Sequence, residues 1–232
     1  MLFSEDRKFV FIAVPKPGTT AIQKRLQQID PNIRRNEVRD KAGRLVQIPT
    51  HATARKIREV MGARAADFTF VAFVRDPRDV IISKYYFYRS GRAAKKQGLS
   101  GAYEGQQSKF QLTRIVRVLS AQLLPLHVWL RVYPYKSSAH FITDDLGAIN
   151  VEKIGLYNRL QEDAQSIFSE FGYDSSDLVL NVENQTTYDR SKNQSSSISN
   201  IVERRLSQDC AIFDSALVEA SKVMRKNGLK DT

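Results

Sequence analysis

The stretch FVFIAVPKPGTTAIQKRL (residues 9–26) contains the strongest structural signal in the sequence. Its first six residues are apolar, with aromatic and β-branched side chains, which predicts a buried strand over 8–14. Its last part has apolar side chains at helical spacing, which predicts a helix over 19–28. A turn with a lysine, one glycine and two threonines joins these two elements. A strand, a glycine-bearing turn and a helix in this order are typical of a phosphate-binding loop.

The residue types in this turn suit an anion. Gly18 lets the main chain approach closely, and the amides of residues 18–21 would point at the anion from the helix N-terminus. Thr19 and Thr20 add hydroxyl donors. Lys16 precedes the glycine, whereas the lysine of the nucleoside-triphosphate loop G-x-x-x-x-G-K-[ST] follows its second glycine. We expect it to neutralise charge on a leaving group; an ordinary strand–turn–helix corner with a threonine cap is the alternative.

A second loop of the same kind follows the apolar stretch DFTFVAFVR (residues 67–75), which predicts another buried strand. Arg75 leaves the end of that strand, and Pro77 suits the first turn of the next helix. Ser83 lies eight residues after Arg75, on this helix. A bidentate guanidinium on one side and a hydroxyl on the other predict a site for a second phosphate.

Length and charge set the class of protein. The chain has 232 residues, 42% of them hydrophobic, which suits one soluble globular domain over 1–232. Lysine and arginine number 36 against 25 aspartates and glutamates, a net charge of +11. This excess predicts an anionic partner: a nucleotide, a polysaccharide, nucleic acid or a membrane surface.

Cysteine content and apolar runs predict the compartment. Cys210 is the only cysteine and lies in a helical apolar pattern, so we expect a structural thiol in a reducing environment. Residues 1–14 lack the pattern of a signal peptide, and no apolar run reaches the roughly 18–20 residues that span a bilayer. The expected location is cytoplasmic, unless a membrane anchor lies outside this sequence.

The remaining pattern predicts an α/β fold with a central, mainly parallel sheet and helices on both of its faces. Further strands are expected over 44–49, 139–142 and 149–157. Further helices are expected over 50–62, 76–90, 109–132 with a break at Pro125, 159–171 and 199–226. Three polar or glycine-rich stretches predict mobile connections, namely 29–45, 90–108 and 184–200.

Two motifs together point to a family. PKPGTT (residues 15–20) resembles the 5′-phosphosulfate loop of the sulfotransferases that use 3′-phosphoadenosine 5′-phosphosulfate (PAPS). VRDPRDVIISKYY (residues 74–86) resembles their 3′-phosphate motif. The order and compactness are most similar to the carbohydrate-type branch, which includes many small bacterial members. The likeness is specific in these two loops, each of which follows a predicted buried strand.

The resemblance implies a P-loop-like sheet and metal-free, in-line transfer of a sulfuryl group from PAPS to a hydroxyl or amine, with adenosine 3′,5′-bisphosphate (PAP) as product. It implies a carbohydrate or a small-molecule alcohol as acceptor. The cofactor-binding residues that it implies are Lys16, Pro17, Gly18, Thr19, Thr20 and Ala21 for the 5′-phosphosulfate, and Arg75 and Ser83 for the 3′-phosphate. Lys16 would also be catalytic, because it stabilises charge on the departing phosphate.

A general base should deprotonate the acceptor, and histidine suits this role because an imidazole titrates near neutral pH. His51 lies between the two loops at a strand-to-helix turn, where many members of the family carry their catalytic histidine. We therefore predict His51 as the base; a carboxylate is the alternative, as some members use glutamate. His127 is predicted to be packed in the core, and His140 is predicted to be structural.

Some residues depart from the family pattern. Pro17 removes one amide donor from the first loop, and Ala21 and Asn158 also differ from the residues expected at their positions. The adenine contacts therefore stay open, with Tyr157 as one candidate.

Two other functions are considered. A P-loop nucleotide kinase or NTPase would need lysine after the glycine and an acidic metal ligand at the strand end, where Arg75 stands. A non-catalytic nucleic-acid-binding module would explain the charge of +11, but no zinc-finger spacing or RNA-binding motif supports it.

Overall fold

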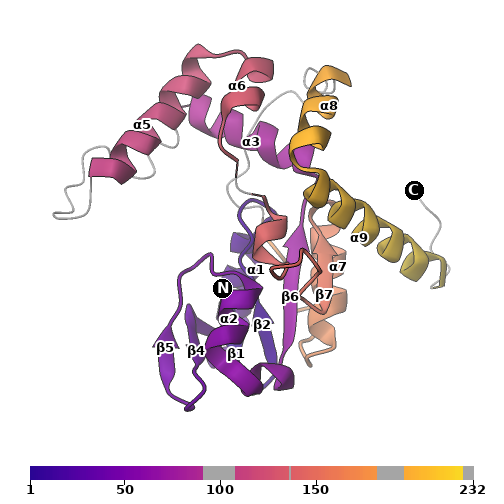
Figure 1. Cartoon of the computed structure of the whole chain (residues 1–232). Coiled ribbons are helices and arrows are strands. Elements are labelled where there is room, and N and C mark those ends of the chain that lie inside the picture. Colours follow the sequence, from indigo (N-terminus) through magenta and orange to yellow (C-terminus); the bar gives the residue numbers. More distant parts are fainter. Residues whose placement is uncertain (91–107, 136, 182–195, 227–232) are drawn as a thin grey trace. The chain divides into compact units, whose positions relative to one another are not determined.

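A computed structural model describes residues 1–90, 108–135, 137–181 and 196–226 (Figure 1). The chain divides into two compact units. The first unit comprises Met1–Asp76, Lys136–Glu183 and Gln208–Thr232, and the second comprises Pro77–Tyr135 and Asn184–Ser207. The single domain expected over 1–232 stays a prediction.

The first unit is built on a five-stranded sheet in the order β3–β1–β2–β6–β7. Its strands are β1 (Leu2–Ser4), β2 (Phe9–Phe11), β3 (Arg34–Arg35), β6 (Thr69–Val74) and β7 (Lys153–Leu156). β2, β6 and β7 are parallel, whereas β1 and β3 add an antiparallel edge. The predicted α/β class is confirmed, and the sheet is mixed, with three parallel strands and two that add antiparallel pairing.

Helices cover both faces of this sheet, which explains why its central strands are apolar on both sides. Phe70 and Ala72 of β6 pack in one core with α2 (Ala54–Met61), η1 (Gly62–Asp67) and α9 (Ser207–Lys226). Val71 and Phe73 point to the other face and pack with α1 (Thr19–Ile29) and α7 (Leu160–Ser169). The two helices predicted over 19–28 and 159–171 are therefore confirmed within one or two residues of their ends.

The connection predicted over 29–45 is wrong, because it contains β3 and one strand of a hairpin. The hairpin pairs β4 (Glu37–Arg39) with β5 (Leu45–Gln47). The Asp40 carboxylate closes its turn by accepting hydrogen bonds from the amides of Ala42 and Arg44, and Gly43 supplies a positive φ of 79°. β5 confirms the strand expected over 44–49, whereas β4 was not predicted, because only one of its three residues is fully buried and its pattern is too short.

Two further predictions along the chain are corrected. Residues Ala139–Phe141 form a 3₁₀ helix, η2, and not a strand, because the Asp209 carboxylate of α9 accepts the amides of Ser138 and Ala139. The helix predicted over 199–226 is two helices, α8 (Ser196–Arg205) and α9, which are separated at Leu206.

The second unit is helical and contains α3 (Pro77–Arg89), α5 (Ser108–Leu123), α6 (Leu126–Val132) and α8 (Figure 1). Its core forms around Trp129, whose ring stacks on Tyr133 with centroids 4.0 Å apart. The predicted break at Pro125 is confirmed, since Pro125 is the N-cap of α6. His127 is exposed, so the prediction that it is packed in the core is wrong.

The expected mobile connections 90–108 and 184–200 fall mostly outside the described residues, although 196–200 belong to α8. Among the described helices, none combines the length and the apolar character that crossing a bilayer requires.

Gly155 of β7 is required by close packing across the sheet. It pairs with Phe73 of β6, and a Cβ at Gly155 would lie 2.6 Å from Cζ of the Phe73 ring. We predict that Gly155→Ala lowers the free energy of unfolding by about 1–3 kcal/mol, because the buried ring has to move. Urea denaturation of Gly155→Ala, Phe73→Leu and the double variant measures the coupling between the two positions. If Gly155→Ala costs the same stability with and without Phe73→Leu, the packing explanation is contradicted.

Candidate functional site

Three loops meet at the carboxyl ends of the parallel strands. The loop after β2 carries Gly18, the loop after β6 carries Arg75, and Tyr157 follows β7 directly. The Arg75 guanidinium lies over the Tyr157 ring, with 4.2 Å between its carbon and the ring centroid. A Cβ on Gly18 would approach Cε2 of the same ring to 3.3 Å. Tyr157 therefore links the two loops that the sequence marks as anion-binding, at the sheet edge where ligands bind in open α/β folds.

The first loop has an uncommon main-chain conformation. Lys16 has a φ of 83°, and Gly18 has a φ of 74°. Between them Pro17 is buried, and its ring restricts φ to about −65°. A left-handed lysine costs about 1–2 kcal/mol relative to a right-handed one, and such strain clusters at functional sites. Pro17 itself has no amide, so the donors that this loop offers to an anion are the amides of Gly18 and of the residues that begin α1.

One side of Gly18 is filled by protein. A Cβ there would lie 2.6 Å from Cδ2 of Leu160, at the start of α7. The glycine is thus needed for close packing against α7 as well as for its positive φ. An anion would have to meet the opposite, amide side of the loop.

The threonines and Ala21 differ in what they offer to an anion. The buried Thr19 hydroxyl donates to the Val14 carbonyl at 3.2 Å, and this hydrogen bond joins the two ends of the loop. The Thr19 hydroxyl proton is therefore already used, and Thr19 can offer an anion only its main-chain amide at the start of α1. The Ala21 amide donates to the Gly18 carbonyl at 3.0 Å. Thr20 is exposed, and its hydroxyl and amide lie in the first turn of α1, where amides lack intrahelical acceptors. Lys16 is half-buried beside these groups in the chain.

His51 is held at the same sheet edge by the main chain. Its Nδ1 lies 2.7 Å from the carbonyl oxygen of Ala13, two residues beyond the end of β2. A carbonyl only accepts, so Nδ1 carries the proton, and Nε2 of the neutral ring has its lone pair available. The side chain is exposed, and its ring meets the edge of Phe141 with centroids 6.4 Å apart. A histidine held in this way can act as a base through Nε2.

Two supporting residues were not predicted to have these roles. Tyr157 was predicted only as a candidate for an adenine contact, and in the structure its ring makes a cation–π contact with Arg75. Asp163 of α7 accepts the Leu156 amide at 2.8 Å and pairs with Arg159 at 3.3 Å, which holds the chain directly before Tyr157. The only sequence signal for Asp163 is an acidic residue in the first turn of a helix.

Arg75 and Ser83 belong to different units. Arg75 is half-buried near the end of a segment of the first unit, whereas Ser83 is a buried residue of α3 in the second. Their joint binding of a 3′-phosphate therefore stays a prediction. Within the first unit, the structure brings together the first loop, Arg75 and Tyr157, and it holds His51 at the end of β2.

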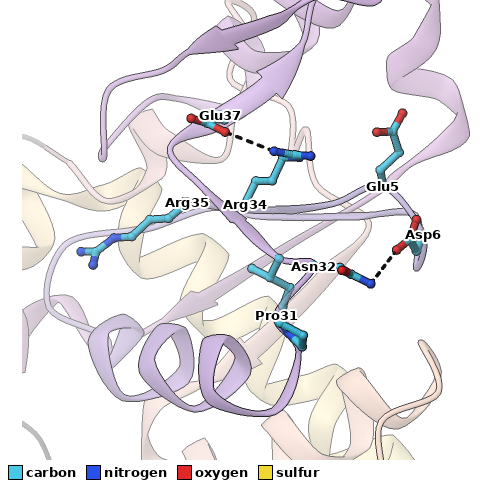
Figure 2. Close-up of a pocket in the computed structure, with 8 residues that line it drawn as sticks. Glu5, Asp6, Pro31, Asn32, Arg34, Arg35 and Glu37 are labelled. Carbon is cyan, nitrogen blue, oxygen red and sulfur yellow. Dashed lines mark hydrogen bonds and ion pairs between the residues drawn. The ribbon is translucent and has the colours of Figure 1, made fainter.

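A cavity of about 420 Å³ lies elsewhere in the first unit (Figure 2). Glu5 and Asp6 line it at the turn before β2, so it is at the amino end of the parallel strands. Its lining mixes acidic and basic side chains, among which Arg34 pairs with Glu37 at 3.7 Å and Asn32 donates to Asp6 at 3.2 Å. None of the predicted site residues lines it. Acidic side chains in the lining do not favour a polyanion there.

The loop edge is thus the better candidate site, because it combines helix-start amides with Lys16 and Arg75. Comparison with protein-family models, with curated proteins and with solved structures found no match. The arguments for function therefore come from the motifs and from this geometry.

Partial burial raises the pKa of Asp163 above its ordinary value of 3.8, against the lowering effects of the Leu156 amide and Arg159. Because the folded state favours the protonated carboxyl, this residue's contribution to stability is complete below 3.8 and is lost as pH rises through the raised pKa. We predict that the stability of the wild type relative to Asp163→Asn falls as pH rises from 3.8 through the raised pKa of Asp163. Urea denaturation at each pH measures this difference.

Asp174 provides the control with the opposite sign. The hydroxyl and amide of Ser176 lower the pKa of Asp174, so its contribution to stability is present above its ordinary pKa and is lost as pH falls. The wild type should therefore gain stability relative to Asp174→Asn as pH rises through the lowered pKa of Asp174 to 3.8. A stability difference between the wild type and Asp163→Asn that does not fall as pH rises above 3.8 would show that the burial of Asp163 has no effect.

Proposed function

We propose that this protein is a sulfotransferase that moves the sulfuryl group of PAPS to a hydroxyl or amine, most simply on a carbohydrate. The observation that carries the proposal is the junction at Tyr157. Its ring supports Arg75 and lies against the glycine of the first loop, so both motifs with likeness to PAPS-binding signatures meet at one sheet edge. A P-loop-like arrangement, in which β2, the loop and α1 form the donor cradle, is part of the same proposal.

The proposed step needs positioning and charge stabilisation. The acceptor oxygen attacks sulfur, the bond between sulfur and the bridging phosphate oxygen breaks, and PAP departs. Lys16 and the helix-start amides stabilise the negative charge that develops on the leaving phosphate. His51 takes the acceptor's proton at Nε2, since the Ala13 carbonyl holds Nδ1 in its protonated form.

The arrangement favours this reaction over a nucleotide kinase. In P-loop kinases and NTPases the lysine follows the second glycine, and an acidic residue at a strand end holds Mg²⁺. Here Lys16 precedes the only glycine of the loop, and the residue that follows β6 is Arg75. A basic group at that place suits a second phosphate on the nucleotide, as in PAPS.

Ligand-induced stabilisation tests donor binding. We predict that PAP without magnesium raises the melting temperature by roughly 5–10 °C at about 100 times its dissociation constant. Lys16→Ala should reduce this shift strongly, whereas Lys24→Ala, on α1 but exposed, should leave it unchanged. A shift with ATP–Mg²⁺ or an oligonucleotide and none with PAP would overturn the proposal in favour of a kinase or a nucleic-acid-binding protein.

The base assignment is tested by transfer of labelled sulfate from PAPS to a panel of glycans and small alcohols. We predict that His51→Ala lowers the transfer rate by about 10²–10⁴-fold while PAP binding stays near the wild-type level. His140→Ala is the matched control, because His140 is also exposed and also contacts Phe141. Retained turnover in His51→Ala would remove this residue from the mechanism and favour a carboxylate base.

A further inference from the structure

The positive charge of the chain is concentrated in the second unit. Pro77–Tyr135 and Asn184–Ser207 contain 14 of the 36 lysines and arginines but only 4 of the 25 aspartates and glutamates. The second unit thus has a net charge of +10, and the first unit has only +1. The proposed donor site of the first loop lies in the nearly neutral unit, so donor binding does not account for this excess.

The same unit has an exposed aliphatic face on α5. Its members are Ile115, Val116, Leu119 and Leu123, which a helical period of 100° per residue places within an arc of about 100°. Leu123 is 77% exposed. The opposite face of α5 is the one that packs: Ala121 is buried in the core of the unit, and the Arg117 guanidinium lies 6.0 Å from the Tyr133 ring. An amphipathic helix of a globular protein normally exposes polar residues, so this face is suited to a partner.

The next helix extends this surface. Val132 of α6 is 60% exposed, and the neighbouring Arg131 is exposed as well. Neither α5 nor α6 contains an aspartate or glutamate, and the sequence has none from residue 105 to residue 143. Aliphatic side chains together with only positive charge are the features of helices that lie in the interface of a membrane.

We propose that the α5 face and the end of α6 bind the surface of a membrane that contains anionic lipids. The aliphatic side chains enter the boundary between headgroups and acyl chains, and the basic residues of the unit interact with the headgroups. At 16 residues α5 is too short to span a bilayer and lies in its plane. This proposal goes beyond the sulfotransferase proposal and does not depend on it.

Other partners satisfy only one of the two observations. Nucleic acid or an acidic glycan would match the charge but would gain little from an aliphatic face, since single strands bind through aromatic stacking and basic grooves. A second copy of the chain would cover the aliphatic face but would bring two units of charge +10 together. An anionic membrane surface matches both the charge and the apolar face.

Vesicle flotation with the full chain tests the proposal. We expect the protein to float with phosphatidylcholine vesicles that contain about 30% phosphatidylglycerol, and to bind at least about tenfold less to pure phosphatidylcholine or in about 1 M salt. The double variant Leu119→Ser/Leu123→Ser should bind anionic vesicles at least about tenfold more weakly. Leu45→Ser/Leu146→Ser, at two exposed leucines of the first unit, is the matched control and should bind like the wild type.

A charge pair completes the test. Arg131→Glu should weaken binding several-fold, whereas Arg44→Glu, the same charge change in the first unit, should not. Thermal denaturation checks that each variant is folded. Failure to float, equal binding to neutral vesicles, or wild-type binding by Leu119→Ser/Leu123→Ser would overturn the proposal. So would light scattering that shows a dimer which Leu119→Ser/Leu123→Ser converts to a monomer, in the absence of vesicle binding, because the face would then join two copies.

Discussion

Parallel pairing of β2 with β6 and of β6 with β7 is the constraint on which the first unit depends. It directs three chain exits to one edge of the sheet, and it buries the central strands on both faces. The register between β6 and β7 then determines that Arg75 and Tyr157 leave their strands beside each other, since Val74 pairs with Leu156. The close contact of Phe73 with Gly155 belongs to the same register. Strand pairing therefore sets both the core and the geometry of the site.

Elements with apolar patterns that can be read along the chain were predictable, namely β2 with α1, β6 with α3, and β7 with α7. Of the short elements, β5 was predicted but β3, β4 and η2 were not, and β3 and η2 depend on partners distant in the sequence. The η2 turn depends on Asp209, about 70 residues away, and β3 exists because Arg35 pairs with Leu2 of the edge strand. For the candidate site, the sequence alone identified the residues of the two loops that suit an anion, such as Lys16, Gly18 and Arg75. The contact of Arg75 with Tyr157 could not be identified in this way, since a register has no local signature.

The two units differ in net charge and therefore in the range over which they attract anions. The first unit is close to neutral, so an anion at its loop would be held by groups within one Debye length, about 8 Å at physiological salt. Those groups are Lys16, Arg75 and the amides at the start of α1. The second unit has almost all of the net charge and so produces the long-range field of the molecule. Recognition of a small anion and attraction to a large anionic surface would thus depend on different residues.

The hydrogen bond from His51 to Ala13 has a consequence for how this position can vary. The acceptor is a main-chain carbonyl, and every amino acid supplies one. Replacement of the side chain at position 13 therefore leaves the acceptor in place as long as the chain beyond β2 keeps its path. Substitution of Ala13 thus does not by itself change the orientation of the His51 imidazole. That orientation would be lost only if the main chain at residue 13 moved.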